Sequence, residues 1–366
     1  MSATQSPKTG GPAAAQAMHQ HPQAPKTGGA GRLLLKVLLL GSPFLAILIT
    51  YFVFDPFRVL YHYQRFEGPL VAIANRDYIS TQTYLNTYER RPYSSFILGN
   101  SRTMGYLTRD WAKLTGDSLS FHYDASSESL YGIWQKLLFL EQHHAALKNV
   151  LIICDHELLK KVDDYDSHLL RKDPRTTGAS TFAFQLSFVK AYFSNTFFYQ
   201  YLYQRATGKF TPELEEILEG RRVAYDPTTN DLTLPDVEQE IKRDSLGFYT
   251  KNDRLKRARK PSVFKAVIGA EQLRQLVAIR NVFARHNTNF QFVVSPLYYQ
   301  QHLNPADISI LQRTFGASHI HDFSGTNEFT SQNGNYYEDS HYRPKVGREI
   351  LRRIYSAPSD SASIRP

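Results

Sequence analysis

The chain has 366 residues, of which 42% are hydrophobic and 21% charged, so it can bury a sizeable core. Its formal net charge is +9, but no zinc-finger, RNA-recognition or basic-zipper signature accompanies that charge, and we expect no nucleic-acid partner. The single cysteine, Cys154, excludes an internal disulfide framework and a cysteine-based zinc site.

The N-terminal part is predicted to be a tail followed by a membrane anchor. Residues 1–31 are rich in Gly, Ala, Pro, Gln and Ser and bury too little apolar surface to order, so a disordered tail is expected. The run from Val37 to Phe54 has no charged residue, which predicts a transmembrane helix over 32–55. A cleaved signal peptide is the competing interpretation, but no small-residue cleavage site precedes Asp55.

The charges around this span predict its orientation. Lys8, Lys26, Arg32 and Lys36 precede it, so by the positive-inside rule the N-terminus is cytoplasmic and the large domain is exported. The chain would cross the membrane once, and the lipid bilayer is its first expected partner. Residues 56–90 are predicted to be a membrane-proximal linker.

After the linker, short β-rich runs alternate with helical stretches. The predicted strands are Phe96–Gly99, Ser118–Tyr123, Asn149–Cys154, Asn289–Pro296 and His319–Phe323. The predicted helices are Leu130–His143, Phe264–His286 and Lys345–Tyr355. This alternation predicts an α/β domain over 91–356: a three-layer α/β/α fold with a five-stranded, mostly parallel sheet. Residues 357–366 would form a flexible tail.

The stretch over 157–262 is too long for a simple crossover and is predicted to be a helical cap insertion. It holds the aromatic stretch Phe182–Tyr203, predicted helical, an acidic helix at Pro212–Glu219 and the basic run Lys251–Lys260. The aromatic stretch either packs on the core or contacts the membrane or a membrane partner. The basic run is expected to be a solvated face, with attraction to anionic lipid or polymer as the alternative.

Two sequence blocks carry candidate chemistry. Ser101 directly follows the first strand, in Gly99-Asn100-Ser101-Arg102-Thr103, where a tight turn would expose its hydroxyl and backbone N–H groups could stabilise an oxyanion. The block Tyr337–Pro344 precedes the last helix and offers His341 as a base. The hypothesis requires these distant segments to meet at one edge of the sheet.

Other polar residues have alternative interpretations. The loop Asp124–Ser129 would line the site. Arg102 and Arg343 flank the two blocks, and either bind an anionic acceptor or pair with nearby carboxylates. The run Asp155-His156-Glu157 is a poor metal site, because adjacent strand residues point to opposite faces. We expect neither a metal nor a cofactor.

The Ser101 and His341 blocks together resemble the SGNH (GDSL-like) hydrolase superfamily. The single anchor, ILGNSRT and SHYRP…VG resemble its membrane-anchored bacterial envelope branch, similar to the teichoic-acid D-alanine transfer protein and to alginate-type O-acetylation proteins. The resemblance covers roughly 90–155 and 264–355 and implies an SGNH/flavodoxin-like fold. It also implies a bacterial cytoplasmic (inner) membrane location, with the domain periplasmic or extracellular.

The resemblance implies roles for the two blocks. Ser101 would be the nucleophile, with its own N–H in the oxyanion hole, and His341 the general base. Glu338 has the family's spacing from the histidine, whereas Asp339 has the usual acid type. Asn100 replaces the Asp of Gly-Asp-Ser.

The resemblance also gives candidates for the remaining oxyanion positions. Gly132 and Ser127 are candidates for the second oxyanion block. Asp155 or His156 stands in the third block, where the family has Asn.

The implied activity is that of a serine acyltransferase or esterase acting on acyl groups of an envelope polysaccharide or related polymer, with an integral membrane acyltransferase as a partner. The alternative is an SGNH-fold scaffold without catalysis that partners such an enzyme. A third hypothesis is lipid or polymer binding through the basic and aromatic cap.

Overall fold

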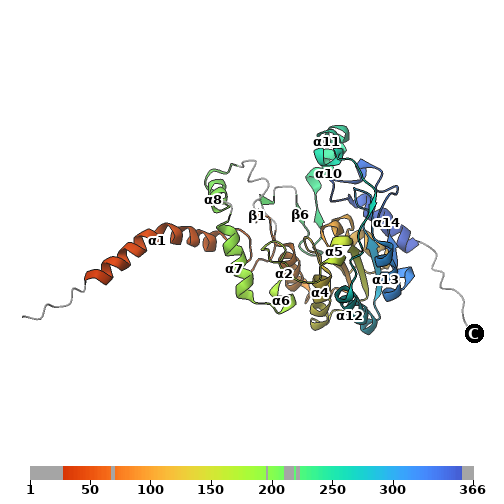
Figure 1. Cartoon of the computed structure of the whole chain (residues 1–366), viewed down its shortest axis with the longest axis horizontal. Helices are drawn as coiled ribbons and strands as arrows, with labels where there is room; N and C mark the ends of the chain where they lie inside the picture. Colours follow the sequence, from red (N-terminus) through yellow and green to blue (C-terminus); the bar gives the residue numbers. More distant parts are fainter. Residues whose placement is uncertain (1–27, 67–70, 195–196, 210–217, 220–222, 357–366) are drawn as a thin grey trace, which may run out of the picture. The chain divides into compact units, whose positions relative to one another are not determined.

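The computed structural model describes residues 28–66, 71–194, 197–209, 218–219 and 223–356 (Figure 1). It divides into two compact units, residues 1–49 and 50–366. Helix α1 (Gly28–Phe54) is long and apolar enough to cross a membrane. This helix begins before the predicted span, so its first turn includes residues 28–31, which were predicted to belong to the tail. The rest of that tail and the tail over 357–366 lie outside the described residues.

The central sheet has five strands in the order β11-β9-β4-β2-β3. The strands are β2 (Ser95–Gly99), β3 (Ser120–His122), β4 (Asn149–Cys154), β9 (Asn289–Val294) and β11 (Ile320–Asp322). All four neighbouring pairs are parallel. The prediction of a five-stranded sheet is therefore confirmed, and its carboxyl edge collects the ends of all five strands.

Strand β4 explains why the sheet needs cover on both sides. Val150 and Ile152 pack in one apolar cluster with side chains of α4 (Leu130–Gln142) and α12 (Ala270–His286). Leu151, which points the opposite way, packs in a second cluster. That cluster includes Trp111 of α3 (Thr108–Thr115) and Leu351 of α14 (Pro344–Ser356). Each such side chain contributes about 1.5–3 kcal/mol when it is fully buried.

Helix α12 begins six residues later than the predicted Phe264 start. Ser262–Val263 forms β8 and pairs in parallel with β10 (Gln301–His302). The backbone that follows is held by Asp307 of α13 (Pro305–Phe315), whose carboxylate accepts hydrogen bonds from Val267 and Ile268. These tertiary contacts override the helical spacing of this stretch.

The segment predicted as a linker, 56–90, belongs to the second unit. Helix α2 (Arg76–Thr87) lies within it and is capped by the Asn75 side chain, which accepts a hydrogen bond from Tyr78 N. Tyr84 on this helix is buried in the same cluster as α4. The linker prediction is therefore wrong for α2, which carries too many buried side chains to be a tether.

The insertion predicted as a cap is only partly helical. Its helices are α5 (His156–Lys160), α6 (Pro174–Thr177), α7 (Thr181–Tyr192), α8 (Phe197–Thr207), α10 (Pro235–Arg243) and α11 (Ser245–Lys251). The aromatic stretch is thus two helices rather than one. Two antiparallel pairs join β1 (Val71–Ala72) to β5 (Leu218–Glu219), and β6 (Ala224–Tyr225) to β7 (Leu232–Thr233). The predicted acidic helix lies outside the described residues except for β5, which is a strand.

Candidate active site

Ser101 begins a tight 3₁₀ turn, η1 (Ser101–Gly105), at the carboxyl end of β2. Gly99 before it has φ +146°, and a Cβ there would lie 2.3 Å from the Ile153 carbonyl oxygen, so only glycine fits. Asn100 caps the turn by accepting a hydrogen bond from Arg102 N at 3.1 Å. Because Ser101 is the first residue of the turn, its N–H has no acceptor within the turn.

Close backbone packing brings the second block to this turn. A Cβ on Gly347 of α14 would lie 1.9 Å from the Gly105 carbonyl oxygen, and one on Gly105 would lie 2.5 Å from the Tyr342 ring. The Tyr342 hydroxyl also contacts that of Tyr106, at 3.3 Å. The two glycines let α14 and η1 touch directly, which sets the position of His341.

The Ser101 hydroxyl lies 2.7 Å from His341 Nε2. The other ring nitrogen, Nδ1, contacts the Glu338 carboxylate. This pattern assigns the tautomer in which Nδ1–H donates to the carboxylate and Nε2 accepts the hydroxyl proton. The His341 and Glu338 side chains are 29% and 20% exposed, so the three residues are reachable from solvent.

The environment of Glu338 keeps it ionised. Burial raises the pKa of its carboxyl, but the hydrogen bond from His341 and that from Ser340 N outweigh burial and lower the pKa to about 2. An ionised carboxylate behind the ring stabilises the imidazolium that forms when the histidine takes a proton.

The neighbouring acid, Asp339, has other partners than the ring. Its carboxylate accepts a hydrogen bond from the Tyr299 hydroxyl at 2.6 Å and contacts Arg257 at 3.3 Å. Of the two acids left open by the sequence, Glu338 is therefore the one that contacts His341.

Asp155, at the carboxyl end of β4, ties the serine turn to the sheet. Its carboxylate accepts hydrogen bonds from Asn100 Nδ2 at 2.5 Å, Arg102 Nη1 at 2.7 Å and Leu158 N at 3.0 Å. The Asp155 carboxylate is an acceptor in all three, so it holds the residues on both sides of Ser101 and does not supply the donor that Asn would supply at this position in the SGNH superfamily.

The two arginines predicted to bind substrate are both paired with carboxylates. Arg102 pairs with Asp155, and Arg343 makes a 2.5 Å contact with Glu238 of α10. Of the two alternatives that the sequence left open, both arginines therefore take the one in which they pair with nearby carboxylates. Arg343 links the cap to the block that carries His341.

The two oxyanion candidates from the second block do not meet Ser101 in the described part of the chain. The Gly132 N–H is already used, because it donates to the Ser129 hydroxyl at 3.0 Å. A Cβ on Gly132 would lie 2.1 Å from Glu128 Oε1, so the glycine makes room for that carboxylate. Ser127 lies exposed in the loop after β3, with φ +46°.

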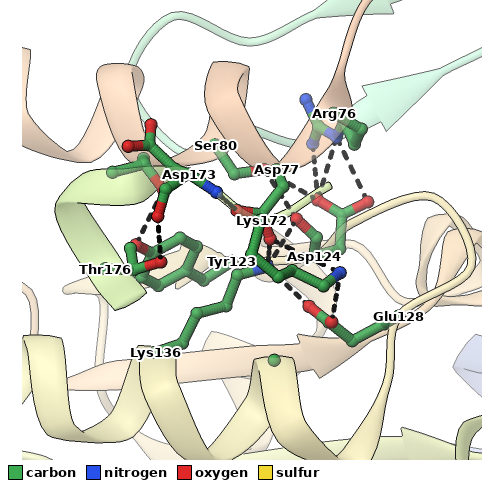
Figure 2. A network of polar contacts seen from close by, with 12 residues as sticks. Arg76, Asp77, Ser80, Tyr123, Asp124, Glu128, Lys136, Lys172, Asp173 and Thr176 are labelled. Atoms are coloured by element: carbon green, nitrogen blue, oxygen red, sulfur yellow. Dashed lines mark hydrogen bonds and ion pairs between the residues drawn. The ribbon is translucent and has the colours of Figure 1, made fainter. Parts of the chain in front are cut away.

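Glu128 belongs to a buried ionic cluster that the sequence analysis missed, defined here as Asp77, Glu128, Lys136 and Lys172 (Figure 2). Lys136 lies 2.6 Å from Glu128 and 2.9 Å from Asp77, and Lys172 lies 2.6 Å from Glu128. Each of these side chains is at most 1% exposed. Burial opposes ionisation of Asp77, but the two lysines prevail and lower its carboxyl pKa. The cluster fixes the 124–129 loop to α2 and α4.

A cleft of about 820 Å³ lies beside the histidine block. Its walls include Tyr337 and Arg343 from that block, and Arg109 and Lys345 near the starts of α3 and α14. The cap closes the other side with residues 224–238. Ser101, His341 and Glu338 are not among the residues that line this cleft, so it lies beside the block and does not contain the Ser101–His341 pair.

No family model matches this sequence, and no curated protein is detectably similar to it. Within the described ranges, no group of three or more His, Cys, Asp or Glu side chains is arranged to hold a metal ion. The chemistry of the site therefore rests on the contacts that join Ser101, His341 and Glu338.

Proposed function

We propose that this chain is a membrane-anchored serine acyltransferase or esterase of SGNH type. The observation that carries the proposal is the continuous contact from Ser101 through His341 to Glu338, across two segments that the sheet brings together. Serine alone is a weak nucleophile, and a histidine oriented by a carboxylate is what activates it.

The reaction would proceed in two halves. His341 Nε2 takes the hydroxyl proton as the Ser101 oxygen attacks the carbonyl carbon of an ester, and the Ser101 N–H stabilises the oxyanion. The imidazolium then gives its proton to the leaving alcohol, which leaves an acyl-serine. A sugar hydroxyl or a water, deprotonated by His341, takes the acyl group and restores the serine.

The proposed setting is a bacterial cell envelope. Helix α1 would cross the cytoplasmic membrane with its N-terminus inside, and the three-layer, flavodoxin-like domain would act in the periplasm or outside. The proposed acceptor is an envelope glycan or related polymer, as the SGNH resemblance implies. An integral membrane acyltransferase is the expected source of acyl groups.

A catalytically inactive scaffold is the second candidate, and one observation favours it. Gly132 and Asp155, which stand in the blocks where the resemblance expects oxyanion residues, are occupied by Ser129 and by the Ser101 turn. Only the Ser101 N–H is then identified as an oxyanion donor. Removing one such donor typically costs 10²–10³-fold in rate.

One experiment separates the two candidates. The full-length chain in detergent micelles is treated with a fluorophosphonate, with Ser101→Ala and His341→Ala as test variants and Ser318→Ala, an exposed serine outside the proposed site, as the control. We expect labelling of the wild type and of Ser318→Ala and none of Ser101→Ala. A folded wild type that stays unlabelled would favour the scaffold.

A further inference from the structure

Helices α7 and α8 pack around the domain end of the spanning helix. Tyr51, in the last turn of α1, is fully buried, and its ring centroid lies 5.3 Å from that of Tyr192 on α7. Phe57, just after the helix, stacks on Phe197 of α8 with ring centroids 5.0 Å apart. Both contacts lie within the second compact unit. The two helices are thus fixed to the point where the chain leaves α1.

Further contacts tie both helices to this point. The Thr50 hydroxyl lies 2.8 Å from the Tyr192 hydroxyl. Arg205 of α8 lies over the Phe54 ring, 5.1 Å from its centroid. Gln185 of α7 donates a 2.8 Å hydrogen bond to the Val59 carbonyl oxygen. If α1 spans a bilayer, α7 and α8 lie at that bilayer's surface.

Both helices are apolar on a second face that the described chain leaves open. On α7, Phe182 is 77% exposed and Leu186 lies one turn further on, also exposed. On α8, Tyr199 is 64% exposed and Tyr203 follows at the same spacing. Residues four apart share one helix face, so each helix presents an apolar pair opposite its buried side. A helix that is apolar on all sides normally has apolar cover on all sides.

The charges on these helices suit a lipid surface. Neither helix contains an acidic residue, and their charged residues are Lys190 and Arg205. Tyrosine is enriched at both membrane–water interfaces, and lysine and arginine side chains there act as interfacial anchors. Anionic headgroups attract such helices, and their apolar side chains enter the boundary between headgroups and acyl chains.

We propose that α7 and α8 lie in the bilayer interface, with the open face defined by Phe182, Leu186, Tyr199 and Tyr203 inserted among lipid headgroups. The inference rests on the proposed membrane anchoring by α1, but not on the proposed catalysis. It makes the anchor a three-part attachment, which limits how far the domain can swing from the membrane.

The lone cysteine makes this testable in the full-length chain. Cys154 is completely buried, so a thiol-reactive NBD dye should label only a cysteine introduced at the surface. The test variants are Phe182→Cys and Tyr199→Cys. Leu246→Cys on α11, where Leu246 is 81% exposed, is the control for a dye in water. Leu39→Cys, within the predicted span, is the control for a dye among acyl chains. Each labelled variant is reconstituted into phosphatidylcholine and phosphatidylglycerol vesicles, with and without brominated acyl chains.

We expect the dye at Phe182 and Tyr199 to emit further to the blue than at Leu246, and to lose intensity in brominated vesicles as the Leu39 control does. The proposal would be overturned if the dye at both test positions emitted and resisted quenching as it does at Leu246 while the dye at Leu39 was quenched. That result would leave the anchor intact. A dye at Leu39 that is not quenched would remove the anchor and the proposal together. Neither result changes the fluorophosphonate outcome, so loss of this proposal is distinguishable from loss of the proposed catalysis.

Discussion

Two groups of carboxylates in this protein differ in what surrounds them. In the buried ionic cluster, Asp77 and Glu128 meet two lysines, and every side chain is sealed from solvent (Figure 2). In the candidate active site, Glu338 meets an imidazole whose far nitrogen reaches a hydroxyl, and the group is partly exposed. Permanent cations in a dry interior fix charges in place, whereas a titratable ring between an acid and an alcohol can move a proton. The first arrangement holds structure, and the second can do chemistry.

The largest effect is expected from Glu338→Gln. An amide beside Nδ1 no longer holds the ring in the productive tautomer or stabilises the imidazolium, so kcat/KM for p-nitrophenyl acetate should fall about 10⁴-fold. The control is Asp339→Asn, which alters an acid that contacts Tyr299 rather than the ring, and should stay within about tenfold of wild type. Equal losses in both variants would mean that Glu338 has no special role.

Lys136→Met should act on folding instead. The substitution leaves Asp77 and Glu128 without the cation that lies 2.9 and 2.6 Å away, and breaking one side of a buried pair costs about 3–5 kcal/mol. The free energy of unfolding is measured by chemical denaturation of the full chain in micelles. Lys113→Met, whose side chain is 76% exposed, is the control and should change it by less than about 0.5 kcal/mol. A small loss in both would show that the cluster is not stabilising.

Asp155→Asn tests the connection between the sheet and the serine turn. Asparagine can still cap α5, but it weakens the charged contact with Arg102 that steadies Ser101. A misplaced nucleophile should lower the acylation rate by about 10²-fold. Fluorophosphonate labelling rates measure this, and the unchanged pH optimum of the residual activity distinguishes misplacement from a lost acid or base. An unaltered rate would leave Asp155 with a capping role only.

The five strands were predictable because short β-rich runs alternate with helical stretches, and strand β4, a continuous apolar run, coincides with its predicted range, Asn149–Cys154. The Ser101 and His341 blocks were predictable because parallel strands end at one edge. Their meeting was a hypothesis of the sequence, but the backbone packing that brings them together was not predictable, since it depends on Gly105 and Gly347 allowing two backbones to touch. The buried cluster was missed, although Lys136 shares a helix face with Ile133 and Leu140. A lysine on an apolar face signals a buried acidic partner, but sequence does not say which acid.

The smallest expected effect is a pH dependence of stability. The carboxyl of Glu338 has its pKa lowered from 4.5 to about 2 on folding, because the hydrogen bond from His341 outweighs burial. The folded state therefore binds the proton less well than the unfolded chain, so its contribution is complete above pH 4.5 and is lost as pH falls toward 2. The difference in unfolding free energy between wild type and Glu338→Gln, roughly 1–2 kcal/mol at neutral pH, should shrink over that interval. Chemical denaturation at successive pH values measures it. A difference that stays constant as pH falls from 4.5 toward 2 would mean that the Glu338 carboxylate makes no stabilising contact with His341. Glu338 would then differ from the carboxylates of the buried ionic cluster only in its exposure.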